Sequence, residues 1–177
     1  MGNIIKKNVT LVIPTYNAEK TINATLNNVS KIFQNIIIID AHSKDLTKAI
    51  CKKYNTQFFT SKKNRGIQLN LGGKKANTNW IFFLHADSIL KNDAIDEIEK
   101  FISIDKNNYK AAAFKLKFNQ DNIYAFCLSK IVTFRSKCFK LPYGDQGLIL
   151  SKVFYNKIGG FKTLPIMEDV EIIRNIG

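Results

Sequence analysis

The chain has 177 residues, of which 45% are hydrophobic and 11% are aromatic, a composition that excludes a disordered chain and fits one folded domain with a sizeable core. Its 27 Lys and Arg residues outnumber its 14 Asp and Glu residues, for a formal net charge of +13, which indicates either a polyanionic or membrane-surface partner or simply a solvated basic surface. The apolar runs are too short to span a bilayer and the amino terminus lacks a signal-peptide pattern, so we expect a cytoplasmic protein.

Strand-like and helix-like segments alternate along the first part of the chain. Residues 9–14 and 35–40 are apolar runs typical of buried strands, and residues 56–61 form a shorter run of the same kind. The first helical pattern places Ile22, Leu26, Val29 and Phe33 on one face. The second is expected to begin at Ser43 as its cap, with an acid in its first turn and an inner face made of Leu46, Ala49, Ile50 and Tyr54.

The alternation continues through residue 104. We expect a helix over residues 65–79, a strand over residues 80–84 and a helix over residues 92–104, whose inward residues are Ile95, Ile98, Phe101 and Ile102. Residues 111–118 alternate weakly and suit an exposed strand. This pattern predicts an α/β fold with a mainly parallel, doubly wound sheet and helices on both faces.

The three cysteines are Cys51, Cys127 and Cys138. Their number is odd, they are widely spaced and no two form a C-x-x-C pair. They therefore predict neither a disulfide framework nor a zinc site, and we expect buried or unused thiols.

Polar residues follow three of the expected strands: the sequences are VIPTYN, IIDAHSKD and FLHADS. In open α/β sheets, ligands bind in the crevice outside the carboxyl ends of the strands. Asp40 and Asp87 each follow an apolar run at corresponding places. A helix-capping role is the alternative for either acid alone, but the two together favour a binding site.

Six segments carry a resemblance to a known family: VIPTYNAEKTINATL, IIIDAHSKDLT, NRGIQLNLGGKKA, WIFFLHADS, GDQGLILSKVFYNKIGGF and MEDVEI. In this order they resemble glycosyltransferase family 2, the nucleotide-sugar transferases of GT-A fold, and within it a small bacterial branch. The resemblance covers nearly the whole chain. It implies a single GT-A-like domain over residues 1–177, with a nucleotide-binding half (1–110) and an acceptor-side half (111–177). Relatives usually continue well beyond the MEDVEI segment, so a truncated acceptor side is one interpretation.

The resemblance assigns nucleotide binding to six positions: Pro14, Tyr16, Glu19, Asp40, Arg65 and Ala86. Tyr16 would lie against the nucleoside, with core packing as the alternative. A carboxylate at Asp40 suits an imide or amide N–H donor, so uracil or guanine fits better than adenine or cytosine. Arg65 would pair with phosphate oxygens, unless it is one more surface cation.

HADS resembles the DXD-type motif, and its last acid, Asp87, is the implied ligand of a divalent cation, Mg²⁺ or Mn²⁺. Such a cation stabilises the departing diphosphate of the donor. The sequence departs from the fuller motif at His85, which stands where many members have the first Asp. His85 either donates to a phosphate or is a satisfied histidine at a strand end.

Glu168 and Asp169 resemble the ED motif of the family, in which an acid accepts the proton of the acceptor hydroxyl. We assign Asp169 as the general base and Glu168 as a second acid beside it. Enrichment of acids at a helix start is the alternative. The segment implied for the sugar and acceptor side contains Gly144, Asp145 and Gln146. Gly159 and Gly160 are expected to end a short helix that begins near Ser151.

We therefore hypothesise an inverting glycosyltransferase that uses a nucleoside-diphosphate sugar and a divalent metal. The acceptor would be a glycan or a lipid-linked molecule, and the basic surface with residues 122–140 would touch an anionic membrane from the cytoplasmic side. A catalytically inactive binding remnant of the same fold is the alternative. A nucleotidyltransferase would need a glycine-rich loop after the first strand, which is missing, and nucleic acid is not expected because few aromatics lie among the basic residues.

Overall fold

The computed structural model describes residues 3–113, 147–164 and 167–176. The described residues form a six-stranded sheet. In sheet order the strands are β3 (Gln57–Thr60), β2 (Asn35–Asp40), β1 (Val9–Thr15), β4 (Trp80–Phe83), β6 (Leu148–Ser151) and β5 (Ala111–Ala113). Strands β1 to β4 are parallel to one another, whereas β6 runs antiparallel to both of its neighbours. The predicted mainly parallel α/β sheet is confirmed.

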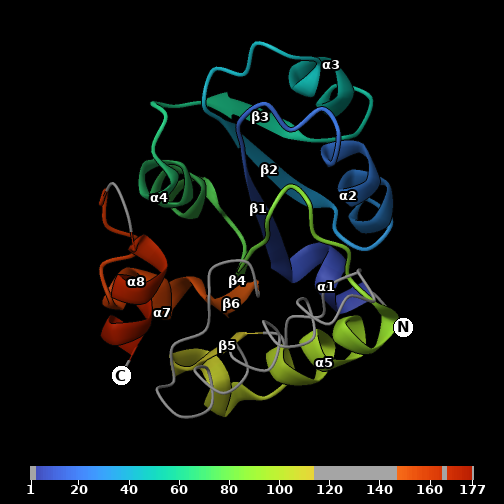
Figure 1. Cartoon of the computed structure of the whole chain (residues 1–177). Helices are drawn as coiled ribbons and strands as arrows, with labels where there is room; N and C mark the ends of the chain where they lie inside the picture. Colours follow the sequence, from blue (N-terminus) through green and yellow to red (C-terminus); the bar gives the residue numbers. More distant parts are fainter. Residues whose placement is uncertain (1–2, 114–146, 165–166, 177) are drawn as a thin grey trace, which may run out of the picture.

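Helices cover both faces of this sheet (Figure 1). The described helices are α1 (Asn3–Asn8), α2 (Ile22–Val29), α3 (Thr47–Cys51), α4 (Arg65–Lys75), α5 (Asn92–Ile102), the 3-10 helix η1 (Asp105–Tyr109), α7 (Lys152–Lys157) and α8 (Glu168–Ile176). Residues of α1, α2, α3 and α5 pack on one face, and residues of α4, α7 and α8 pack on the other. The result is a three-layer arrangement with a hydrophobic core on each side of the sheet.

The two cores follow from the two-residue period of a strand. Leu11 and Phe82 point into the core under α2 and α5, and their neighbours Val12 and Phe83 point into the core under α4 and α7. Because successive side chains alternate between the faces, a strand that is buried on both sides must be apolar throughout. This explains the unbroken apolar runs that end at the polar residues of the candidate site.

Helix α4 lies unusually close to the sheet because it carries glycine where it crosses β1. A Cβ atom added at Gly72 would lie 2.2 Å from Cγ1 of Val12, and one added at Gly73 would lie 2.4 Å from the ring of Tyr155. At the carboxyl end of the helix, Lys152 Nζ donates to the carbonyl of Gly73 at 2.5 Å. These contacts fix α4, so that its amino terminus points to the carboxyl edge of the sheet.

Several sequence-based boundaries differ from the structure. The prediction that Ser43 caps a helix is wrong, because α3 begins at Thr47 and Ser43 is used elsewhere, as described below. Helix α4 ends at Lys75 rather than at residue 79, and α1 was not predicted. The expected inward face of α5 is confirmed, as are the two glycines after α7, both with positive φ. The expected strand 111–118 is described only as far as Ala113, and residues 122–140 lie outside the described residues.

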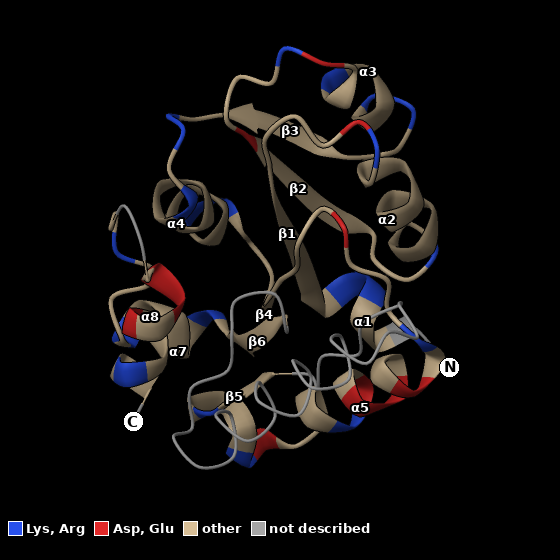
Figure 2. Cartoon of the chain, in the orientation of Figure 1, with Lys and Arg blue, Asp and Glu red and all other residues tan. Residues whose placement is uncertain are grey.

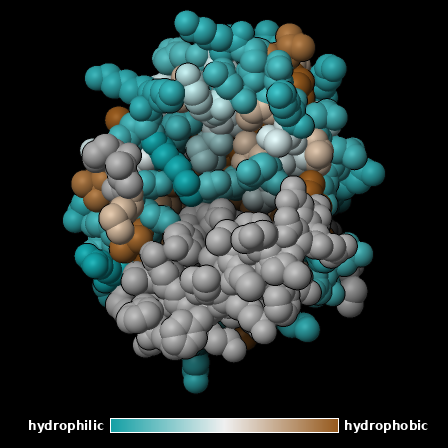
Figure 3. Space-filling model, in the orientation of Figure 1, coloured by the Kyte–Doolittle hydropathy of each residue, from teal (hydrophilic) through white to brown (hydrophobic). Residues whose placement is uncertain are grey.

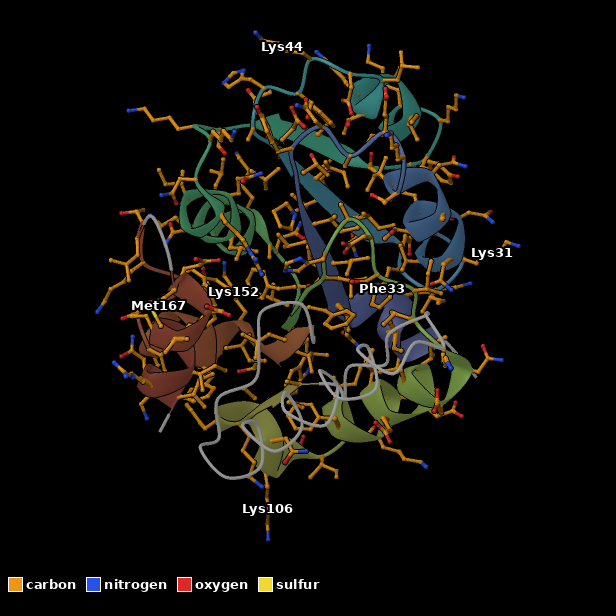
Figure 4. All side chains as sticks on the ribbon, viewed as in Figure 1. Lys31, Phe33, Lys44, Lys106, Lys152 and Met167 are labelled. Carbon is orange, nitrogen blue, oxygen red and sulfur yellow. The ribbon has the colours of Figure 1, made fainter. Side chains whose placement is uncertain are left out.

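The surface of the described residues is largely polar and basic. Figure 3 shows a mostly hydrophilic upper part of the molecule, with a few hydrophobic residues near α8. The basic side chains of Lys31, Lys44 and Lys106 extend away from the body of the molecule (Figure 4). The aromatic side chain of Phe33, by contrast, lies inside it. Within the described ranges, no helix is both long and apolar enough to cross a membrane.

Candidate active site

The polar strand ends meet at the carboxyl edge of the sheet. From β1 the chain continues to β2 and β3 on one side, and then crosses to β4 on the other side. The loops after β1 and β4 therefore diverge at the point where the strand order reverses, which is where open α/β sheets bind ligands. Tyr16 in the first loop and Asp87 in the second flank this point.

Asp40 is buried at the end of β2, with 3% of its surface exposed. Its carboxylate accepts hydrogen bonds from Thr15 Oγ1 at 2.8 Å, from Ser43 N at 2.8 Å and from Ser43 Oγ at 2.6 Å. A carboxylate has about four acceptor positions, so roughly one is left for a ligand. Asp40 thus organises the β2–α3 turn, and its predicted contact with a nucleobase stays a prediction.

The loops after β1 and β2 are joined by hydrogen bonds in both directions. Asn17 N donates to Ser43 Oγ at 2.8 Å, and Lys44 N donates to Asn17 Oδ1 at 3.0 Å. Leu46 N donates to Glu19 Oε2 at 3.0 Å. The carboxylate of Glu19 is therefore used to hold the start of α3, and these bonds make a preformed platform from two loops.

Asp45 completes this platform. Its carboxylate accepts from Glu19 N at 3.0 Å and from both the amide and the hydroxyl of Thr47, at 3.0 and 2.6 Å. Burial acts to raise the pKa of Asp45, but the hydrogen bonds from Thr47 and Glu19 outweigh it, so the pKa lies below its usual value of 3.8. The carboxylate is accordingly charged at neutral pH.

Tyr16 is exposed on this platform, with 45% of its surface accessible. Core packing, the alternative considered from the sequence, is therefore wrong for this residue. Lys63 Nζ lies 3.9 Å from the centroid of the Tyr16 ring, which shows that the ring face is accessible to a cation. The preceding Pro14 is half-buried in β1. An exposed aromatic ring of this kind can stack on a nucleobase.

The loop after β4 is held by helix α2. Thr25 Oγ1 donates to the carbonyl of Ala86 at 2.9 Å, and Asn28 forms a reciprocal pair with the backbone of Leu90, at 2.8 and 3.0 Å. Ala86 is thereby fixed through its backbone, while the side chain of Asp87 is exposed. The loop therefore exposes one carboxylate on a supported backbone.

Among the described residues, Asp87 has too few neighbouring ligands to hold a metal ion by protein side chains alone. In the part of the chain that the structure describes, no three His, Cys, Asp or Glu side chains are grouped so as to hold a metal ion. Mg²⁺ commonly binds through one or two carboxylates, with substrate phosphates and water supplying the other ligands. The exposed carboxylate of Asp87 fits this pattern.

His85 precedes Asp87 and contacts Arg65, whose Nη2 lies within hydrogen-bond distance of His85 Nε2. Arginine can only donate, so Nε2 is the acceptor and the neutral imidazole carries its proton on Nδ1. Burial, and then the positive charge of Arg65, lower the pKa of His85 to about 4, although Asp87 and Asp169 act in the opposite direction. His85 is neutral at pH 7, and neither ring nitrogen is available to a metal ion while the Arg65 contact lasts.

Arg65 also contacts the first residue of α8. Its Nε lies 3.0 Å from Glu168 Oε1, and this pair is electrostatic rather than a well-directed hydrogen bond. Glu168 is buried with 5% of its surface exposed, whereas 39% of the Arg65 side chain is accessible. Arg65 therefore joins the amino terminus of α4 to that of α8, and its outer edge stays open to the crevice.

Asp169 follows in the first turn of α8, where Figure 2 shows acidic residues gathered. Its Oδ1 accepts from Val170 N at 2.9 Å, and the residue lies at the positive end of the helix dipole. Asp169 and His85 line one pocket, whose other walls are mainly apolar: Leu69, Phe83, Leu84, Ala113, Gly147, Leu148, Phe161, Ile172 and Ile173. The pocket brings the proposed general base to the histidine beside the proposed metal ligand.

Most of the predicted site residues thus lie at one edge of the sheet. Gly144, Asp145 and Gln146 lie outside the described residues. Sequence reasoning missed Gln68, which is buried and whose Nε2 donates to the carbonyls of Thr15 and Ile39, at 2.9 and 2.7 Å. It also missed Lys63. A buried glutamine on an otherwise helical segment resembles any surface glutamine in a sequence, so no pattern could have revealed it.

Comparisons with known proteins agree with this arrangement. The model of the family described as glycosyl transferase family 2 matches residues 10–158. A poly(ribitol-phosphate) beta-N-acetylglucosaminyltransferase, TarP of Staphylococcus aureus, is 33% identical over 107 residues, which are 54% of this chain and 33% of that protein. An uncharacterized glycosyltransferase of Rickettsia bellii is 31% identical over 109 residues, which are 57% of this chain and 16% of that protein. The chain spans a third or less of the length of these relatives.

Two solved structures share the fold. TarS residues 1–349 of Staphylococcus aureus, in complex with UDP-GlcNAc, superimpose with a TM-score of 0.73 at 18% identity, covering 96% of this chain and 53% of that one. The mannosyltransferase PcManGT from Pyrobaculum calidifontis, in complex with GDP-Man and Mn²⁺, gives a TM-score of 0.70 at 18% identity, covering 94% of this chain and 50% of that one. Both similarities support the GT-A fold.

Proposed function

Since the chain belongs to glycosyl transferase family 2, we propose that it transfers a sugar from a nucleoside-diphosphate sugar to an acceptor hydroxyl, with inversion at the sugar carbon. One observation carries this proposal: Arg65, His85 and Asp169 come together from three separate elements at the carboxyl edge of the sheet. This juxtaposition supports a role for Arg65 as the cation that meets phosphate and for Asp169 as the carboxylate that accepts a proton. The nucleotide-sugar complexes of the structural neighbours support the donor class.

The donor would bind across the switch point of the sheet. Its base would stack on Tyr16 over the platform made by the two loops, and its phosphates would meet the open edge of Arg65. Asp87 would hold a divalent cation, which neutralises charge on the diphosphate leaving group when it is bound. The presence of Mn²⁺ in the PcManGT complex supports a cation of this kind.

Asp169 would act on the acceptor. A hydroxyl is too weakly acidic to attack unaided, so a carboxylate within hydrogen-bond reach must take its proton as the new bond forms. In a direct displacement the acceptor oxygen attacks the sugar carbon from the side opposite the diphosphate, which leaves with its electron pair. Asp169 lies in the first turn of α8, where its carboxylate would accept this proton.

For the acceptor we propose a glycan or lipid-linked molecule with negative charge. The relatives TarP and TarS are named for poly(ribitol-phosphate), a polyanion, and the net charge of +13 suits such a partner. The same charge supports peripheral binding to an anionic membrane from the cytoplasmic side. Sedimentation with liposomes tests this last part: equal binding to neutral and anionic vesicles would contradict it.

The donor proposal is tested by thermal unfolding with UDP, GDP, CDP or TDP, each with Mn²⁺, Mg²⁺ or EDTA. A ligand at about 100 times its dissociation constant stabilises the folded state by roughly 2.7 kcal/mol. We expect one nucleotide to raise the melting temperature with the metal, and Asp87→Ala to remove most of that rise. If no nucleotide shifts the melting temperature, the chain is an inactive remnant of the fold rather than a transferase.

A further inference from the structure

The contacts of Arg65 differ from those of a simple surface cation. Its guanidinium lies between a buried carboxylate of α8 and the imidazole of the loop after β4. The two partners approach different nitrogens: Glu168 faces Nε, and His85 Nε2 faces Nη2. A guanidinium has five N–H groups in a fixed plane, so two neighbours on different nitrogens set the orientation of the whole group.

We propose that His85 and Glu168 are positioning residues, which hold Arg65 so that its remaining N–H groups face the diphosphate of the donor. This inference rests on the proposed function, since it presupposes a donor phosphate at Arg65. It changes the interpretation of both residues from the sequence. Glu168 becomes the charge partner of Arg65 rather than a second catalytic acid, and His85 becomes a hydrogen-bond acceptor rather than a phosphate donor.

The contact between Arg65 and His85 fixes which of the two residues donates the hydrogen bond. Because arginine cannot accept a hydrogen bond, Nε2 of His85, which meets Arg65, must be unprotonated and cannot donate to a phosphate, so the Nδ1–H is the one donor left on the ring. Of the five N–H groups of Arg65, one Nη2–H is used by His85, and Nε lies beside the Glu168 carboxylate as a charge pair rather than as a directed hydrogen bond. Three N–H groups remain on Nη1 and Nη2, and 39% of the Arg65 side chain is accessible. A bidentate phosphate contact needs only two of them.

The surrounding backbone supports this role because both helix starts are fixed to each other. Asn64 caps α4 through Ile67 N, and its Nδ2 donates to the carbonyl of Leu164 at 3.0 Å. A Cβ atom at Gly66 would lie 2.4 Å from the carbonyl of Lys162. Residues 162 and 164, which precede α8, thus pack on the start of α4. A displacement of Arg65 would therefore also displace Glu168, its partner in α8.

The test is a double-mutant cycle on nucleotide binding, measured by calorimetry with the nucleoside diphosphate and metal that stabilise the wild-type chain. We expect His85→Ala and Arg65→Ala each to weaken binding about tenfold or more. The double variant should be no weaker than Arg65→Ala alone, because a positioning residue has nothing to position once Arg65 is gone. If His85→Ala weakens binding as much in the Arg65→Ala background, His85 contacts the donor itself and the proposal is overturned.

Conservative variants separate positioning from folding. His85→Gln keeps an acceptor near the place of Nε2 and should bind the nucleotide within about twofold of the wild type. Glu168→Gln removes the negative charge that faces Arg65 and should weaken binding several-fold. Its melting temperature without nucleotide, compared with that of the wild type, shows whether the variant is folded. If His85→Gln loses as much affinity as His85→Ala while remaining folded, the acceptor role is wrong. A wild-type chain that binds none of the nucleotides would instead overturn the proposed function, and with it the role of Arg65.

Discussion

Gly66 lies directly against the backbone of Lys162: a Cβ atom added at the glycine would be 2.4 Å from the lysine carbonyl oxygen. This contact brings the starts of α4 and α8 together and places Arg65 beside Glu168. Because a backbone carbonyl cannot rotate away as a side chain can, a methyl group here must push the two segments apart. The glycine is therefore required by close approach and not by a special backbone angle.

We predict that Gly66→Ala destabilises the fold by about 1–2 kcal/mol, because the clash outweighs the better helix propensity of alanine, which is worth at most about 1 kcal/mol. It should also weaken nucleotide binding, since Arg65 is displaced. Gly72→Ala is the matched control: it clashes with Val12 of the sheet and not with residues 162–164. Chemical denaturation should show a loss of stability in both variants, and a loss of affinity only in Gly66→Ala. Equal affinity of the two variants would argue against a link between this contact and the site.

The alternation of apolar runs allowed the sheet to be predicted, because a doubly covered parallel strand leaves an unmistakable pattern. The helix starts were less predictable. Ser43 has the residue type and position of a helix cap, yet its hydroxyl bonds to Asp40 and Asn17 N instead. Whether Ser43 caps a helix or bonds to a neighbouring loop depends on tertiary contacts, which cannot be deduced from the sequence. For the same reason, the pairing of Arg65 with Glu168, 103 positions later in the sequence, could not be foreseen.

Asp40 is expected to be important for stability as well as for base recognition. Asp40→Asn replaces one of the two carboxylate oxygens by an NH₂ group, which meets either the Ser43 N–H or the Thr15 and Ser43 hydroxyls. Leaving a buried polar group without a partner costs about 1–3 kcal/mol. Denaturant titration of Asp40→Asn should show a loss in this range, against about 1 kcal/mol for Ser43→Ala. Unchanged stability of Asp40→Asn would mean that the carboxylate is reserved for the ligand.

Tyr16 is expected to act on binding alone. Because the ring is 45% exposed, Tyr16→Ala should leave the melting temperature of the free chain nearly unchanged. Stacking of a base on an aromatic ring is worth about 1–3 kcal/mol, so the affinity for the nucleotide should fall by roughly 5- to 150-fold. Tyr16→Phe keeps the ring face and serves as the control. Binding that depends on the hydroxyl and not on the ring would contradict the stacking model.

Tyr155 should make the fold sensitive to alkaline pH. Burial raises its pKa from 10.0 to about 12, although its hydrogen bond with Phe161 N acts to lower it. Between pH 10 and 12 the unfolded chain releases this proton while the folded chain keeps it, so the free energy of unfolding must fall as the pH rises. The loss is about 1.4 kcal/mol per pH unit across that window.

Tyr155→Phe separates this effect from other alkaline titrations. At pH 7 the variant should be about 1 kcal/mol less stable, because Phe161 N loses its partner. As the pH rises above 10, the wild type should lose stability faster than the variant, and the difference should shrink and then reverse. Urea titrations at a series of pH values provide the measurement. A constant difference from pH 7 to pH 11.5 would show that Tyr155 titrates normally.

Asp169 and Glu168 are adjacent acids for which we predict different kinetic signatures. Asp169→Asn removes the proposed base, and general-base catalysis contributes about 10²- to 10⁴-fold, so kcat should fall by at least about 100-fold while nucleotide affinity stays within about twofold. Glu168→Gln should instead raise the KM for the donor, because its partner Arg65 is released. Steady-state kinetics with saturating acceptor separate the two. If both variants lowered kcat equally at unchanged KM, the two carboxylates would act together in the chemical step, and Glu168 would not be the charge partner that orients Arg65.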